Sequence, residues 1–131
     1  MLKFEVYPDS GLSKNGLNVM TVGQLKALRN ARRNVLDEGF FLGMEAMQIH
    51  GSWTMLEKAF ISIEQFYSNV PYDYDGLACV VAPYIDGFVK AGVLKDDSPR
   101  IVKDYKLKAT KVKKRDENKV VIKIGEYVGD E

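Results

Sequence analysis

The stretch that decides the fold runs from residue 73 to residue 98 and reads DYDGLACVVAPYIDGFVKAGVLKDDS. Between Asp75 and Val93 its apolar residues recur with the period of an amphipathic helix. Pro83 interrupts this pattern and is expected to kink the first turns or to start the regular helix. Gly92 is typical of the residue that ends a helix. The stretch therefore predicts one amphipathic helix with aspartates at both ends.

Four other segments have the composition of strands. The first alternates apolar with polar residues, and the second is rich in β-branched and aromatic residues. The turn-forming run Arg115-Asp116-Glu117-Asn118 predicts a hairpin that joins the last two. The predicted strands are residues 2–7, 59–67, 101–112 and 119–124.

A first helix is predicted over residues 22–38. Thr21 is its expected N-cap, and Gln24 three residues later completes a capping-box pattern. Gly39 is the expected stop signal for this helix. Residues 40–49, apolar and rich in methionine, form either a second short helix or a continuation of the first.

The predicted element order is β-α-β-α-β-β. This order indicates an α+β fold, with a mixed β-sheet and two main helices packed on one face. The length of 131 residues favours one domain over residues 1–131, and 46% hydrophobic and 28% charged residues are typical of a globular protein. No apolar run is long enough to span a membrane, and the first residues lack the apolar stretch of a signal peptide.

Two residue counts exclude classes of chemistry. Cys79 is the only cysteine, so the chain cannot form an intrachain disulfide, which fits a reducing compartment. His50 is the only histidine, which argues against a histidine-based zinc site and against a Ser-His-Asp triad.

Cations gather in two places, although the net charge is only +1. Segment 103–119 holds eight cations against three acids, and the first helix carries a cluster of arginines. Such a distribution suits binding of a polyanion. The alternative is a solvated hairpin with lysines on its outer face. The candidate polyanion-binding residues are Arg29, Arg32, Arg33, Lys103, Lys106, Lys108, Lys111, Lys113, Lys114 and Arg115.

Aspartates cluster at the two ends of the central helix. Asp73 and Asp75 are two residues apart, so on an extended segment both side chains point to one side. Asp96 or Asp97 is placed to complete a metal site from the turn after the helix, and Mg²⁺ or Mn²⁺ prefers such oxygen ligands. Asp86 returns to nearly the same helix face as Asp75. The alternative is that these aspartates are ordinary cap and turn residues.

Three motifs within residues 73–98 follow one another in a recognisable order. They are DYDGL at 73–77, IDGF at 85–88 and AGVLKDDS at 91–98. Their order and spacing resemble the RusA family of Holliday junction resolvases of bacteria, prophages and phages. That family has Asp-x-Asp-Asn/Gly-Leu, a helix with Asp-Ala-Leu, then Gly, one or two apolar residues and Asp-Asp.

The resemblance implies a homodimer that binds four-way DNA junctions and cleaves them with Mg²⁺ or Mn²⁺. It implies that Asp73, Asp75 and Asp97 are the catalytic, metal-binding carboxylates, with Asp96 as a further metal ligand and Asp86 as an accessory residue. It also implies that the cations named above bind DNA, and that the protein acts in recombination and repair in the cytoplasm of a bacterial or phage-infected cell.

The chain departs from the family pattern at one position. The family has a lysine on the helix between the Asp-x-Asp motif and the helix aspartate, and the matching position here is Cys79 or Ala82. Such a cation would stabilise the negative charge that develops during phosphodiester cleavage. Two alternatives to an active nuclease therefore stay open: a catalytically weak or inactive junction-binding relative, and a small protein that makes only protein contacts.

Overall fold

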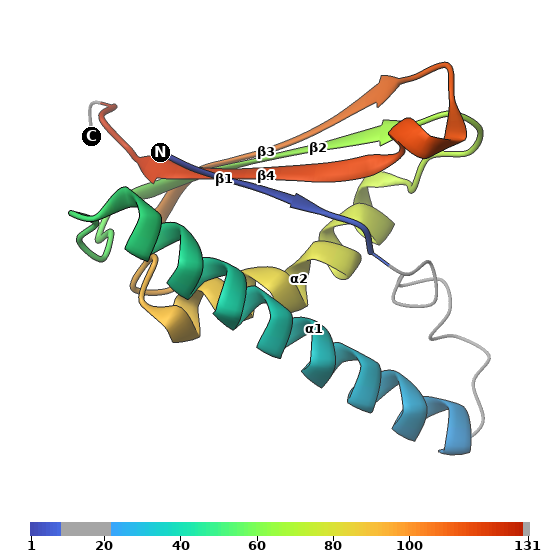
Figure 1. Cartoon of the computed structure of the whole chain (residues 1–131), viewed down its shortest axis with the longest axis horizontal. Helices are drawn as coiled ribbons and strands as arrows, with labels where there is room; N and C mark the ends of the chain where they lie inside the picture. Colours follow the sequence, from blue (N-terminus) through green and yellow to red (C-terminus); the bar gives the residue numbers. More distant parts are fainter. Residues whose placement is uncertain (9–21, 130–131) are drawn as a thin grey trace.

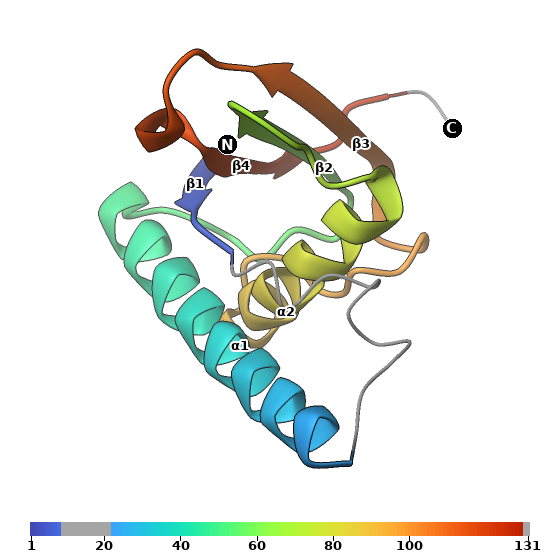
Figure 2. The same ribbon diagram turned by 90° about the vertical axis from the view of Figure 1, so that its right-hand side faces the viewer.

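The computed structural model describes residues 1–8 and 22–129, which form a four-stranded sheet with two helices on one face (Figure 1, Figure 2). This confirms the predicted α+β class with a mixed sheet. The capping box predicted at Thr21 rests on a residue that lies outside the described ones. The elements are β1 (Leu2–Val6), α1 (Val22–His50), β2 (Ala59–Tyr67), α2 (Tyr74–Ala91), β3 (Val102–Lys111), the 3₁₀ turn η3 (Arg115–Glu117) and β4 (Lys119–Glu126).

The strands lie in the order β1-β4-β2-β3. Strand β4 is antiparallel to both β1 and β2, whereas β2 and β3 are parallel. The predicted hairpin between the last two strands is therefore wrong, because β2 lies between them. Pairing β2 with β4 sets Ile61 opposite Ile124 and Ile63 opposite Ile122, which gathers four buried isoleucines at the centre of the sheet. The lysine-rich β3 takes an edge, where charge discourages pairing with other chains.

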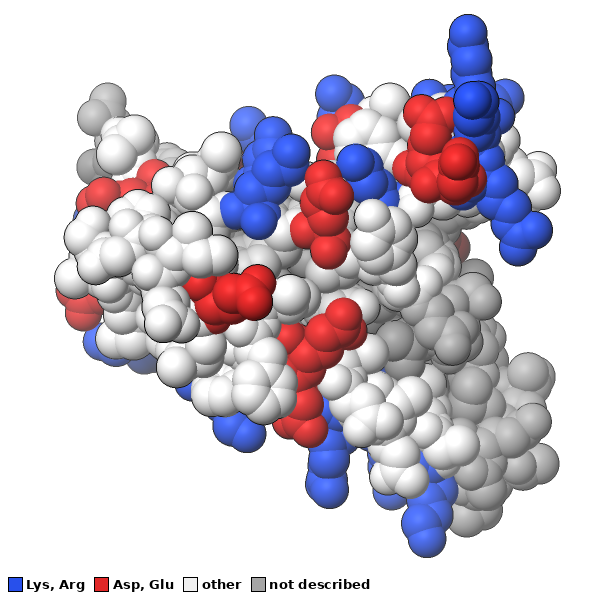
Figure 3. All heavy atoms as spheres, viewed as in Figure 1, with Lys and Arg blue, Asp and Glu red and all other residues white. Residues whose placement is uncertain are grey.

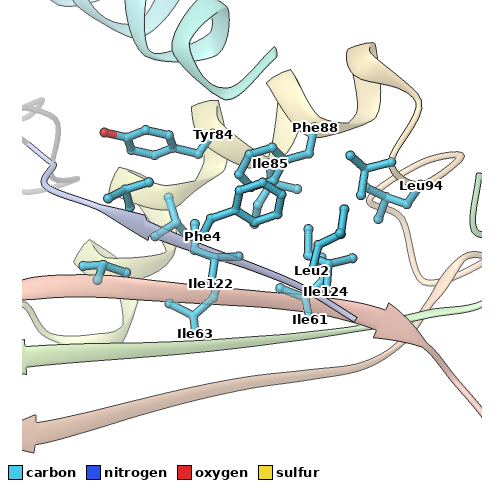
Figure 4. Packing of buried hydrophobic residues seen from close by; sticks show 14 of the residues in the cluster. Leu2, Phe4, Ile61, Ile63, Tyr84, Ile85, Phe88, Leu94, Ile122 and Ile124 are labelled. Carbon is cyan, nitrogen blue, oxygen red and sulfur yellow. The ribbon is translucent and has the colours of Figure 1, made fainter. Parts of the chain in front are cut away.

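The core lies between the sheet and α2 (Figure 4). The rings of Phe4 on β1 and Phe88 on α2 stack with centroids 4.1 Å apart. Ile61, Ile63 and Leu77 are fully buried members of the same cluster. Burial of this apolar surface is the main force that holds α2 against the sheet.

Helix α1 does not stop at Gly39 but continues to His50. The glycine serves packing instead of termination. A Cβ atom at Gly39 would lie 2.5 Å from the carbonyl oxygen of Tyr84, and one at Gly87 would lie 2.3 Å from that of Leu36. The two glycines therefore let the backbones of α1 and α2 touch, which offsets the cost of about 1 kcal/mol for glycine within a helix.

Helix α2 is continuous through Pro83, and it ends at Gly92, whose φ of 93° is left-handed. Proline has no N–H, so the carbonyl four residues earlier, that of Cys79, loses its usual helical donor. Among the described residues, no helix has both the length and the apolar character needed to cross a membrane.

Candidate functional site

The candidate site is built around two carboxyl groups. Asp86 lies on α2, and Asp97 lies in the loop between α2 and β3. The two side chains lie close enough for the charge of Asp97, and a hydrogen-bonding contact with it, to act on the pKa of Asp86. Burial raises the pKa of Asp86, the charge of Asp97 and this contact raise it further, and the positive charge of Arg32 lowers it. Two carboxylates this close repel each other when both are ionised, so the pair favours a shared proton or a cation.

Tyr105 approaches the pair from strand β3. In the parallel pairing of β2 and β3, Tyr105 is the partner of Ile61, whose side chain is buried in the core. Burial raises the pKa of Tyr105, and the negative charge of Asp97 raises it further. The phenol therefore stays protonated near neutral pH and can donate a hydrogen bond beside Asp97.

Arg32 reaches the same face from helix α1. Its Nη2 donates to the Sγ atom of Cys79 over 2.8 Å. Cys79 precedes Asp86 by seven residues, about two helical turns, so both project from one face of α2. The guanidinium therefore lies along the face that carries Asp86, which accounts for its effect on the pKa of that carboxyl.

Asp73 and Asp75 lie at the N-terminus of α2. Asp73 is the N-cap, and its Oδ1 accepts a hydrogen bond from the backbone N–H of Gly76 over 2.6 Å. Asp75 is in the first helical turn, so the expected extended pair with both side chains on one side is wrong. At 1.5 Å per residue, Asp75 is about 16 Å from Asp86 along the helix axis. The structure thus brings Asp97 to Asp86 and leaves Asp73 and Asp75 at the far end of the helix.

Asp96 makes a hydrogen bond within the loop that follows α2. Its Oδ1 accepts a hydrogen bond from the backbone N–H of Asp97 over 2.9 Å. This contact fixes the backbone from which the Asp97 side chain projects. Asp96 is itself exposed to solvent.

The carboxylates of Asp86 and Asp97 are the candidate ligands for a divalent cation. Within residues 1–8 and 22–129, no group of three or more His, Cys, Asp or Glu side chains is arranged to hold a metal ion. Mg²⁺, however, keeps several waters and binds proteins through as few as one or two carboxylates. Asp86 and Asp97 therefore fit Mg²⁺ or Mn²⁺ as a two-carboxylate site completed by water.

The predicted DNA-binding cations lie in two regions. Lys and Arg side chains gather where β3 leads into η3, and others lie along α1 (Figure 3). On β3, Lys106 pairs with Asp104 over 3.5 Å and Lys108 with Glu64 over 3.9 Å. Arg32 differs from the other candidates because it is half-buried against α2. The exposed ones are Arg29, Arg33, Lys103, Lys106, Lys108, Lys111, Lys113, Lys114 and Arg115.

Two members of the site were missed from the sequence. In the sequence Tyr105 is only part of a predicted strand, and Cys79 stands out only as the single cysteine and as a possible match to the lysine position of the RusA family. The register of β3 against β2 and the crossing of α1 with α2 place them, and neither has a local sequence signal. No family model and no curated protein matches the chain.

Proposed function

We propose that the protein is a divalent-metal-dependent endodeoxyribonuclease that cleaves branched DNA, such as four-way junctions. The observation that carries this proposal is the proximity of the Asp86 and Asp97 carboxyl groups near the end of α2, through which Asp97 raises the pKa of Asp86. A bound divalent cation would relieve the repulsion between these two carboxylates. The same cation would attract the negatively charged phosphates of DNA, which makes DNA a suitable substrate. The RusA-like order of motifs in residues 73–98 supports DNA junctions as the substrate class.

Asp86 and Asp97 would hold Mg²⁺ or Mn²⁺, and Asp96 would fix the loop that presents Asp97. When bound, the metal would lower the pKa of a water and stabilise charge on the phosphate. Tyr105 would orient Asp97 by a hydrogen bond. In the hydrolysis, a water molecule loses a proton as its oxygen bonds to phosphorus, the bond from phosphorus to the leaving sugar oxygen breaks, and that sugar oxygen takes up a proton.

The exposed cations would hold the DNA backbone. The connection from β3 to η3 and the outer surface of α1 are separate regions of the molecule, which suits contacts to different arms of one junction (Figure 3). Phosphate contacts of this kind release counterions, so binding should weaken steeply with salt. A homodimer in the cytoplasm of a bacterial or phage-infected cell would present two such sites to the junction.

The cleavage test uses a mobile four-way junction and a linear duplex of the same sequence, each with Mg²⁺ or Mn²⁺. We expect junction cleavage by the wild type and a loss of about 100-fold or more in Asp86→Asn and in Asp97→Asn, since metal stabilisation of the phosphate supplies several kcal/mol. Glu45→Gln, which removes an exposed carboxylate on α1, is the matched control. An intact junction with wild-type protein, or equal cleavage by Asp86→Asn, would refute the proposal.

A second candidate is a junction-binding protein without cleavage. It is favoured by the position of Asp73, whose carboxylate caps α2, and of Asp75, about 16 Å from Asp86 along the helix. Salt-dependent junction binding without cleavage in any divalent cation, and without Mn²⁺ binding, would favour this candidate.

A further inference from the structure

Arg32 is set apart from the other cations by its contacts. It is half-buried, its Nη2 lies 2.8 Å from the Sγ atom of Cys79, and its charge acts on Asp86. A thiol is a weak hydrogen-bond acceptor, so the contact with Cys79 can be exchanged at small cost. The Arg32 guanidinium thus lies on the face of α2 that carries Asp86, where it can reach a phosphate oxygen bound beside the two carboxyl groups.

We propose that Arg32 binds a non-bridging oxygen of the scissile phosphate beside the Asp86–Asp97 pair, so that helix α1 supplies the active-site cation. This inference rests on the proposed nuclease function. The planar guanidinium matches the geometry of two phosphate oxygens. A cation already in place as negative charge develops on the phosphate stabilises the transition state without reorganisation.

The helix crossing holds this cation in position. Gly39 follows Arg32 by seven residues on α1, about two turns, and so faces the same way. Its backbone is pressed against Tyr84, while that of Gly87 is pressed against Leu36. Because these contacts are between backbones, α1 cannot slide along α2 without a clash. The position of Arg32 relative to Asp86 is therefore set by the packing of the fold.

Other cations with known contacts are engaged elsewhere. Lys90 lies over the ring of Phe40, with its Nζ 5.7 Å from the ring centroid. Lys95 pairs with Glu57 over 3.6 Å. Arg29 and Arg33 are exposed on α1. Arg32, by contrast, has a described contact on the face of α2 that carries Asp86.

The test compares the wild type with Arg32→Gln, Arg32→Lys and Arg33→Gln in two assays. The first is single-turnover cleavage of a four-way junction with Mn²⁺ at increasing protein concentration. We expect Arg32→Gln to lower the saturated rate by about 100-fold, the usual effect of removing one transition-state donor, and Arg32→Lys to recover part of it. Arg33→Gln removes the same charge one residue away and should instead raise the protein concentration needed for half-saturation.

The second assay is thermal unfolding with increasing inorganic phosphate in the presence of Mg²⁺, which needs no cleavage. Phosphate should raise the Tm of the wild type and of Arg33→Gln but not that of Arg32→Gln. The Tm without phosphate shows whether each variant folds. Because a purely structural role would change that baseline and not the response to phosphate, the assay separates the two roles.

The outcomes distinguish the inference from the proposed function. If the wild type cleaves junctions and Arg32→Gln reaches the same saturated rate, the inference is overturned and the nuclease function stands. If the wild type does not cleave, the nuclease function fails and the phosphate response decides alone. A response lost in Arg32→Gln then supports an anion site at Arg32, and an equal response, or none in the wild type, overturns it.

Discussion

The carboxyl group of Asp86 on helix α2 lies close to that of Asp97 in the loop that follows the helix, and Asp97 adds to the effect of burial in raising the pKa of Asp86. The positive charge of Arg32 from α1 lowers the pKa of Asp86, and the negative charge of Asp97 acts in turn on Tyr105 from β3, whose pKa is raised by burial and by Asp97. Four parts of the chain therefore meet at one acidic pair. Several consequences for stability and for ligand binding can be measured.

Replacing Asp86 with asparagine should stabilise the metal-free protein at neutral pH. The pKa of Asp86 is raised in the folded state, first by burial and then by Asp97. A raised carboxyl pKa stabilises the fold below the ordinary value of about 4, and this contribution is lost as the pH rises through the folded-state value. The advantage of Asp86→Asn should therefore grow as the pH rises from about 4 through the raised folded-state pKa of Asp86.

Urea denaturation in the presence of a chelator measures this difference in the free energy of unfolding. The effect should be modest because the Asp86 side chain is largely exposed to solvent. Glu45→Gln, which also removes an exposed carboxylate, should show no such dependence on pH. An advantage that shrinks toward neutral pH would contradict the repulsion between Asp86 and Asp97.

Asp73 should behave as a helix cap and not as a metal ligand. Its carboxylate accepts the N–H of Gly76, so Asp73→Ala should lower the free energy of unfolding by about 1 kcal/mol. Asparagine caps helices as well as aspartate does, so Asp73→Asn should keep both stability and junction cleavage. Denaturant melts measure the stability of the two variants, and the junction assay measures their cleavage. If Asp73→Asn is stable but does not cleave, the carboxylate of Asp73 is needed for the chemistry.

Gly87→Ala should destabilise the protein strongly, because its new methyl group would meet the carbonyl oxygen of Leu36 at 2.3 Å. Overpacking at a rigid contact typically costs about 1–3 kcal/mol. Gly43→Ala is the matched comparison, since its methyl group would meet the Cβ atom of Ala91 at 3.1 Å. Thermal melts should rank Gly87→Ala well below Gly43→Ala, and an equal Tm for the two would argue against the close crossing of α1 and α2.

Tyr84 should make the protein sensitive to alkali. Burial, followed by the charge of Glu38 and a hydrogen bond with it, raises the pKa of Tyr84 to about 12. The protonated phenol stabilises the fold below its ordinary pKa of about 10, and this contribution is lost as the pH rises toward 12. Tyr84→Phe should lose less free energy of unfolding than the wild type between these pH values, by on the order of 2 kcal/mol. Parallel losses in the two proteins would rule out the raised pKa.

Much of the fold follows from local pattern in the sequence. The alternation in β1 and the helical period from Leu77 to Phe88 predicted the elements that form the core. The predicted end of α1 at Gly39 was wrong because glycine occurs both where helices end and where two backbones pack closely. The close contact of Gly39 with Tyr84 shows the second role, and the sequence alone does not reveal that contact. The last two strands were predicted as a hairpin because nothing in their own residues shows that β2 lies between them.

The site was less predictable than the fold. Asp97 was assigned to a metal with Asp73 and Asp75, and Asp86 was an accessory, because the motif order says nothing about distance. The length of α2 sets that distance, and it places Asp86, not Asp75, within reach of Asp97. Arg32 was grouped with its exposed neighbours because its contact with Cys79 depends on how two helices cross.

The central claim is that Asp86 and Asp97 together hold a divalent cation. Titrating the protein with Mn²⁺ and following the electron paramagnetic resonance signal of the free ion tests it without any assay of cleavage. We predict that the wild type, Asp73→Asn and Glu45→Gln bind Mn²⁺ alike and that Asp86→Asn and Asp97→Asn lose this binding. Undiminished binding by Asp86→Asn, or binding lost in Asp73→Asn and kept in Asp86→Asn, would contradict the account.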